Sequence, residues 1–221
     1  VALTLAFLCL GALMAYFGQT YQTGADPWQL FFNWAVLSLP WILIARFAPL
    51  WILWLVLLNL SIALYHDQLG SILSMGISKD ESLSWCLLLL NFTSLLVWEL
   101  CKSKHSWLNQ NWATRLLAMS TISSASGLAL MSIFSHDSTG LGALVWLVLM
   151  ALAYVVYRLK QPDLFMLSLC CLSAIGVIIS WVANTIENVA DDSLFFILFT
   201  LTIGLTSAAA IWLKKLVKEL Q

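Results

Sequence analysis

The sequence predicts an all-α fold: a polytopic bundle of about eight transmembrane helices, forming a single domain over residues 1–221. Hydrophobic residues make up 62% of the chain and charged residues 10%, whereas soluble proteins contain roughly 25% charged residues. Apolar runs of about 20 residues, enough to cross a hydrocarbon core of about 30 Å, recur along the chain. No segment alternates polar and apolar residues over about ten positions, as the strands of a transmembrane barrel do.

Polar connections and prolines set the boundaries of the expected helices. Asp26 followed by Pro27 marks a helix start, because the carboxylate can accept hydrogen bonds from free amides and Pro at the first helical position loses none. The short run 46–49 predicts a tight hairpin, and residues 66–81 form the longest polar connection. The expected helices are residues 1–17, 27–45, 49–65, 82–100, 112–134, 141–157, 162–182 and 193–213.

The basic residues are distributed unevenly between the two sets of connections. The connections after the second, fourth and sixth helices and the C-terminal tail contain Arg46, Lys102, Lys104, Arg115, Arg158, Lys160, Lys214, Lys215 and Lys218. In the remaining connections Lys79 is the only basic residue. The acidic residues there are Asp26, Asp67, Asp80, Glu81, Asp137, Glu187, Asp191 and Asp192. Because cytoplasmic loops are rich in Lys and Arg, the even-numbered helices are expected to end in the cytoplasm. Both ends of the sequence would then be cytoplasmic.

Aromatic and small residues predict how the helices pack. Most of the tryptophans fall near the expected membrane interfaces, where aromatic belts occur; Trp34 and Trp146 lie deeper, and we interpret them as packing residues. Small residues at four-residue spacing allow close helix contacts in lipid. They predict a tightly packed interior made of the fifth, seventh and eighth helices, with the rows Ser120/Ser124, Ser123/Gly127, Gly176/Ser180 and Thr200/Gly204/Ala208.

A dense group of polar residues surrounds the start of the second helix, on the expected outer side. Asp26, Gln29 and Asn33 follow one another at spacings of three and four, which places them on one helical face. A capped helix start with amides bonded to a neighbouring helix would explain this polar stripe, and so would a ligand site. Asn59 and Asn91 are interpreted as interhelical contacts, although they could also form the floor of a cavity. The candidate ligand-binding residues are Gln19, Tyr21, Gln22, Asp26, Gln29, Asn33 and Asn59.

Other polar residues give little indication of chemistry. No ionisable residue is expected at mid-depth, which disfavours a proton relay or ion-coupled pump; Glu99 is expected to pair with Lys102, and Arg158 to reach the interface. The five cysteines and three histidines lack the spacing of a disulfide framework or metal site, and hydrolase and nucleotide motifs are missing. The sequence therefore predicts no cofactor, and it favours a non-enzymatic protein.

One run of residues resembles a known family. Residues 18–30, GQTYQTGADPWQL, are followed by Trp34 and by Leu39-Pro40-Trp41. This motif resembles the hallmark of a bacterial family of predicted inner-membrane proteins that is defined as a domain of unknown function. The resemblance covers about residues 16–50. It implies a multi-pass protein of the bacterial inner membrane with further sequence before Val1, and it carries no catalytic or ligand-binding assignment.

Three classes of function remain open. The leading hypothesis is a non-enzymatic membrane module that supports envelope assembly or a partner protein. The alternative is a carrier or channel for a small solute or lipid that enters at the outer polar group; an intramembrane enzyme is the third. The expected partners are the lipid bilayer and a protein in the membrane or periplasm. A net charge of −1 without long runs of one sign argues against nucleic acid.

Overall fold

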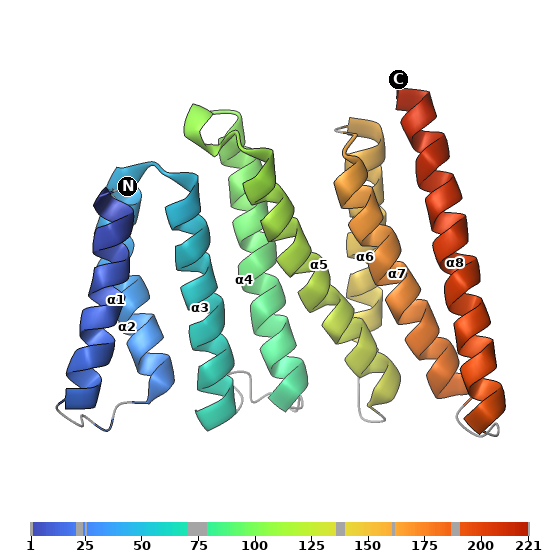
Figure 1. The fold of residues 1–221 in the computed structure, drawn as a ribbon, viewed down its shortest axis with the longest axis horizontal. Coiled ribbons are helices and arrows are strands. Elements are labelled where there is room, and N and C mark those ends of the chain that lie inside the picture. Colours follow the sequence, from blue (N-terminus) through green and yellow to red (C-terminus); the bar gives the residue numbers. More distant parts are fainter. Residues whose placement is uncertain are drawn as a thin grey trace. The chain divides into compact units, whose positions relative to one another are not determined.

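A computed structural model describes residues 2–20, 24, 26–69, 79–135, 140–160, 162–186 and 191–220. Within these residues the all-α class is confirmed: there are eight helices long and apolar enough to cross a membrane, and no strand (Figure 1). The helices are α1 (Ala2–Thr20), α2 (Pro27–Ala45), α3 (Ala48–Leu69), α4 (Lys79–Lys102), α5 (Asn111–Phe134), α6 (Leu141–Val155), α7 (Leu164–Thr185) and α8 (Asp191–Leu220). Two shorter pieces are η1 (Ser106–Leu108), a 3-10 turn, and η2 (Val156–Lys160), a π-helical turn.

The start of α2 illustrates where the predicted capping was right and where it was wrong. The helix begins at Pro27 and ends at Ala45 as expected, and Arg46 leaves it in the left-handed conformation at φ 45°. The side chain of Asp26 makes no capping hydrogen bond; its backbone oxygen accepts from the Gln29 amide at 3.0 Å instead. A carboxylate cap of the kind expected for α2 is found at the start of α7, where the Asp163 side chain accepts from the Phe165 amide at 2.9 Å.

The chain divides into two compact units, residues 1–117 and 118–221, which we describe separately. In the first unit, α2 packs against both α1 and α3, and α3 packs against α4. One core cluster joins the first three helices through Phe7, Ala35, Ile42, Leu50 and Leu57. A second cluster includes Leu55, Trp98, Leu108 and Leu117, which come from α3, α4, η1 and the first turns of α5.

Tryptophan side chains hold the first three helices together. The indole of Trp34 donates to the Phe7 carbonyl at 2.9 Å, and its ring lies 5.2 Å from that of Phe7 between centroids. The indole of Trp54 donates to the Ala35 carbonyl at 2.9 Å. Gly11 makes room for this packing, since a Cβ there would lie 2.6 Å from Trp34 Cε2. The interpretation of Trp34 as a packing residue is confirmed.

In the second unit, a chain of hydrogen bonds connects α5, α6 and α7. The indole of Trp146, which is buried, donates to Ser173 Oγ at 2.9 Å. Ser173 and Ser126 are 2.7 Å apart between hydroxyl oxygens, and Ser126 donates to the Ile122 carbonyl at 2.7 Å. A hydroxyl has one proton, so Ser173 donates to Ser126 and the chain runs in one direction. The packing role of Trp146 is confirmed.

The predicted interior of small-residue rows is wrong for α8. Thr200, Gly204 and Ala208 are all exposed, and a Cβ at Gly204 or at Gly176 would meet none of the described residues within 4 Å. The close approach in this unit occurs instead at Gly142 of α6, where a Cβ would lie 2.6 Å from the Leu128 carbonyl oxygen and from Ser132 Oγ. Four-residue spacing shows that two helices can approach but not that they do.

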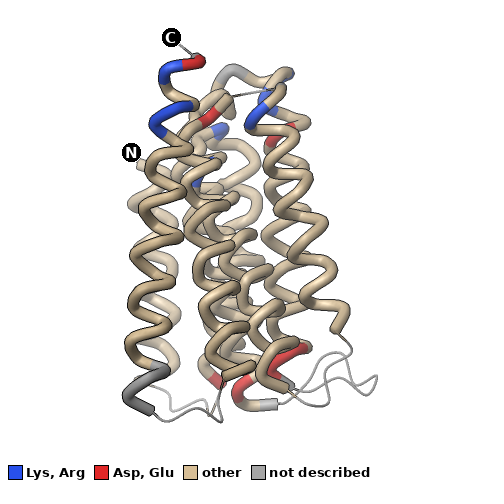
Figure 2. The backbone as a smooth tube through the Cα atoms, turned by 90° about the vertical axis from the view of Figure 1, so that its right-hand side faces the viewer, with Lys and Arg blue, Asp and Glu red and all other residues tan. Residues whose placement is uncertain are grey.

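Figure 2 marks Lys and Arg residues along the backbone at one end of the helices, whereas Lys79 begins α4 at the opposite end from Lys102. In the first unit Arg46 follows α2, while Lys102 and Lys104 lie at and after the end of α4. Asp67 and Asp80 lie at the opposite end of the same unit, near the end of α3 and the start of α4. The charge asymmetry read from the sequence is therefore a spatial asymmetry, and the cytoplasmic position of the basic end stays a prediction.

Cysteine labelling checks that orientation at the two ends of one helix. Asp80 and Ser103 are both exposed, in the first turn of α4 and in the turn after it. In a background without the native cysteines, we expect Asp80→Cys to react in intact cells with a maleimide that cannot cross the membrane. We expect Ser103→Cys to react only after the cells are permeabilised, because basic loops stay in the cytoplasm. The reverse pattern would overturn the orientation.

Candidate functional site

The structure places the candidate residues of the polar stripe at one end of the first unit. Gln19 is exposed in the last turn of α1, and Tyr21 and Gln22 lie outside the described residues. Asp26 and Gln29 are half-buried, whereas Asn33 is exposed. The stripe thus occupies the first two turns of α2, at the acidic end of the unit.

Asn33 points away from the helices that pack against α2. The buried residues of α2 are Ala35, Ser38 and Ile42, which form the opposite face. Neighbouring exposed side chains on the Asn33 face are Phe32, Val36 and Leu37. Within the described part of the chain, no hydrogen bond connects the side chain of Asn33 to another residue. This amide is therefore available to a molecule outside the unit.

The start of α2 is attached to α3 by residues beside the stripe. Ser61 is buried, and its hydroxyl donates to the Trp28 carbonyl at 3.2 Å. The Trp28 ring packs edge-on against Tyr65, with 5.0 Å between centroids. Packed side chains of α3 therefore lie directly beneath the first turn of α2.

Asn59 and Asn91 form a reciprocal amide contact between α3 and α4. Asn59 Nδ2 donates to Asn91 Oδ1 at 3.1 Å, and Asn91 Nδ2 donates to Asn59 Oδ1 at 2.8 Å. The two Nδ2 groups also donate to the carbonyls one turn earlier, Leu55 at 2.8 Å and Leu87 at 2.9 Å. Asn91 is only 3% exposed. The interpretation of these amides as an interhelical contact is confirmed.

Two titratable residues that the sequence assigned to a polar connection are buried in helices. His66 lies in the last turn of α3 with 1% exposure, and Glu81 lies in the first turn of α4 with 7% exposure. Glu81 Oε1 accepts from the indole of Trp85 at 3.4 Å. The four-residue spacing of Glu81 and Trp85 was the sequence signal that could have placed Glu81 on the helix.

At the basic ends, one expected ion pair is missing among the described residues and one that was not expected is found. Glu99 does not pair with Lys102; its Oε1 is buried and has no hydrogen-bond partner in the part of the chain that the structure describes. Arg158, which was expected to reach the interface, forms an ion pair with Glu219 of α8 at 2.6 Å. Helix α8 extends to Leu220, well past the expected end near residue 213, and this extension brings Glu219 opposite η2.

Comparison with known proteins identifies a resemblance at the N-terminal end of the chain. Residues 1–51 match a family described as a predicted membrane protein, DUF2157. The matched residues comprise α1, α2 and the first residues of α3, and they include Asp26, Gln29 and Asn33. No curated protein and no solved structure matches the chain. The chain is thus a multi-pass membrane protein whose N-terminal part resembles a family of unknown function.

Proposed function

We propose that the chain is a non-enzymatic module of the bacterial inner membrane that supports envelope assembly or a partner protein. The observation that carries the proposal is the reciprocal contact between Asn59 and Asn91. A carrier with an outer polar site would need amides facing a water-accessible cavity beneath the stripe. These two amides instead bond to each other and to their own helices, as expected of residues that hold a scaffold together.

The exposed face of α2 is the surface that we assign to a partner. Asn33 stands among Phe32, Val36 and Leu37, all exposed. An amide facing hydrocarbon without a hydrogen-bond partner is costly. A helix of another protein that carried its own polar group at this depth would satisfy Asn33 and cover the apolar side chains around it.

Complementation of a strain that lacks the gene tests the proposal. Asp26→Asn removes the charge of the stripe and keeps the size of the side chain, which makes no capping hydrogen bond, so we expect this variant to complement fully. Asn33→Leu removes the amide of the partner surface, and we expect it to fail although the protein is folded and inserted. Thr200→Leu is the matched control, because Thr200 is an exposed polar residue on α8.

The carrier hypothesis predicts a different pattern. A solute site built on the stripe would lose function in both Asp26→Asn and Asn33→Leu, because both polar groups would contact the solute. If the Asp26→Asn protein folds and inserts into the membrane but does not complement, the proposal of a non-enzymatic module is contradicted. Full complementation by Asn33→Leu would show that the exposed face of α2 is not the partner surface.

A further inference from the structure

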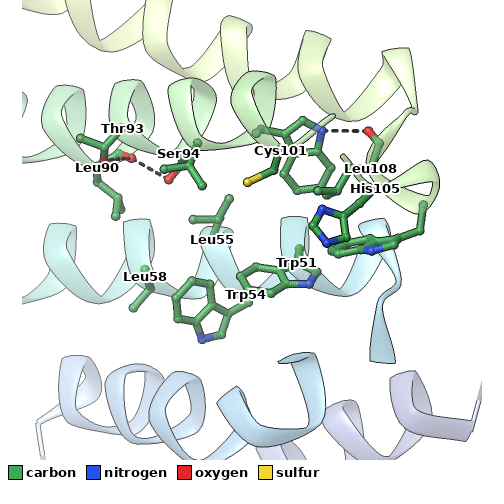
Figure 3. A pocket seen from close by; sticks show the side chains of 13 residues that line it. Trp51, Trp54, Leu55, Leu58, Leu90, Thr93, Ser94, Cys101, His105 and Leu108 are labelled. Atoms are coloured by element: carbon green, nitrogen blue, oxygen red, sulfur yellow. Dashed lines mark hydrogen bonds between the residues drawn. The ribbon is translucent and has the colours of Figure 1, made fainter. Parts of the chain in front are cut away.

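A pocket of about 400 Å³ lies between α3, α4 and the η1 segment of the first unit. It is at the basic end, opposite the polar stripe. Its walls are mostly aromatic and aliphatic, and the lining residues include Trp51, Trp54, Trp98 and Trp107. Figure 3 shows Trp51 and Trp54 of α3 on one side of the pocket and Ser94 and Cys101 of α4 on the other. Its volume falls within the range of about 300–1,000 Å³ that is typical of ligand pockets.

The turn after α4 builds one side of this pocket. The amides of Lys104 and His105 both donate to the Cys101 carbonyl, at 3.0 Å and 3.1 Å, which turns the chain back toward α3. The indole of Trp98 then donates to the Leu108 carbonyl at 3.2 Å and fixes η1 against α4. Trp107 is stacked on Trp51 of α3, with 6.4 Å between ring centroids.

The hydroxyl residues in the wall do not make the pocket polar. Thr93 Oγ1 donates to the Leu89 carbonyl at 2.7 Å, and Ser94 Oγ donates to the Leu90 carbonyl at 2.7 Å. Each hydroxyl proton is therefore used within α4. Such a pocket favours an apolar occupant, and in a membrane the most abundant apolar molecules are acyl chains.

The segment of chain beside the pocket carries two lysines. Lys102 and Lys104 belong to the turn between two residues that line the pocket, Cys101 and His105, and Lys104 and His105 are exposed. Glu99 is on the same helix but does not line the pocket. In addition, the indole nitrogens of Trp51 and Trp107 are buried and have no hydrogen-bond partner among the described residues. An indole N–H is a donor only, so these groups call for an acceptor oxygen.

We propose that this pocket binds one acyl chain of an anionic phospholipid. The chain fills the space between Trp54 and Trp98, and the phosphate faces Lys102 and Lys104 at the rim. Ester or phosphate oxygens accept from the indoles of Trp51 and Trp107, whose rings turn toward the head group on binding. Tryptophan and lysine are the residues that membrane proteins commonly place at head-group level.

Binding of two defined lipids to the purified full chain in detergent tests the proposal. Phosphatidylglycerol and phosphatidylcholine with identical acyl chains differ in head-group charge, and native mass spectrometry measures the bound fraction of each. We expect phosphatidylglycerol to bind about tenfold more tightly, which corresponds to one or two charge-assisted contacts. The double variant Lys102→Gln/Lys104→Gln should abolish this preference, whereas Lys214→Gln/Lys215→Gln on α8 should keep it.

Two further variants separate the head-group contacts from the acyl-chain contacts. Trp107→Phe keeps an aromatic side chain, although a smaller one, and removes the donor; we expect it to weaken the binding of phosphatidylglycerol about fivefold. Trp112→Phe is its control, because that exposed indole donates to Gln110 Oε1 at 2.6 Å outside the pocket. Ser94→Phe fills the pocket and should weaken the binding of both lipids equally. Equal binding of the two lipids, or binding of either that Ser94→Phe does not change, would overturn the proposal.

Discussion

Replacing Gly142 with leucine is expected to lower the free energy of unfolding of the second unit by about 1–3 kcal/mol or more. The first atom of the new side chain would lie 2.6 Å from the Leu128 carbonyl oxygen and from Ser132 Oγ. A serine side chain can rotate, but a backbone carbonyl within α5 cannot move without displacing the helix. Thermal unfolding in detergent, followed by circular dichroism, measures the change.

Gly204 provides the matched control for this substitution. It is also a helical glycine, yet a Cβ there would have no neighbour within 4 Å in the described part of the chain. Gly204→Leu should therefore leave the unfolding temperature of the purified protein unchanged. An equal loss of stability in Gly204→Leu and Gly142→Leu would contradict the helix packing described for the second unit.

Replacing Asn59 with leucine is expected to destabilise the first unit by about 1–2 kcal/mol. The substitution removes both hydrogen bonds to Asn91 and leaves the Asn91 carbonyl oxygen buried without the donor it has now. The double variant Asn59→Leu/Asn91→Leu removes that unpaired group as well, so the two effects should not add. We expect a coupling energy of about 0.6–1.7 kcal/mol.

Asn33→Leu is the control for this double-mutant cycle, because the same chemical change occurs at an exposed position of the first unit. It should leave the unfolding temperature unchanged in detergent. Strict additivity of Asn59→Leu and Asn91→Leu would show that the amide contact contributes nothing to the stability of the α3–α4 pair.

Much of the helical architecture could be predicted from the sequence, because bilayer thickness fixes the length of each apolar run. The start of α2 at Pro27 followed from proline chemistry. The C-terminal end of α8 could not be predicted in the same way. The sequence predicted that the last helix ends near Leu213, before Lys214, Lys215 and Lys218, but α8 continues to Leu220.

The contacts between helices were much less predictable than the helices themselves. The sequence identified Asn59 and Asn91 as candidates for interhelical bonds, but nothing in it showed that they meet each other. Gly142 belongs to none of the small-residue rows, so its close contact with α5 was missed. The aromatic pocket was missed because Trp51, Trp98 and Trp107 were interpreted only as markers of the membrane interface.

Solvent access to Ser61 tests most directly whether the polar residues of the first unit form a scaffold or line a transport path. Ser61 lies beneath the stripe, buried and bonded to the Trp28 carbonyl, and Ser61→Cys changes only one atom. In a background without native cysteines, a small charged thiol reagent should not modify Ser61→Cys in intact cells, while it modifies exposed Asp80→Cys. Modification of both variants at similar rates would contradict the scaffold and show a water-filled path beneath Asp26 and Gln29.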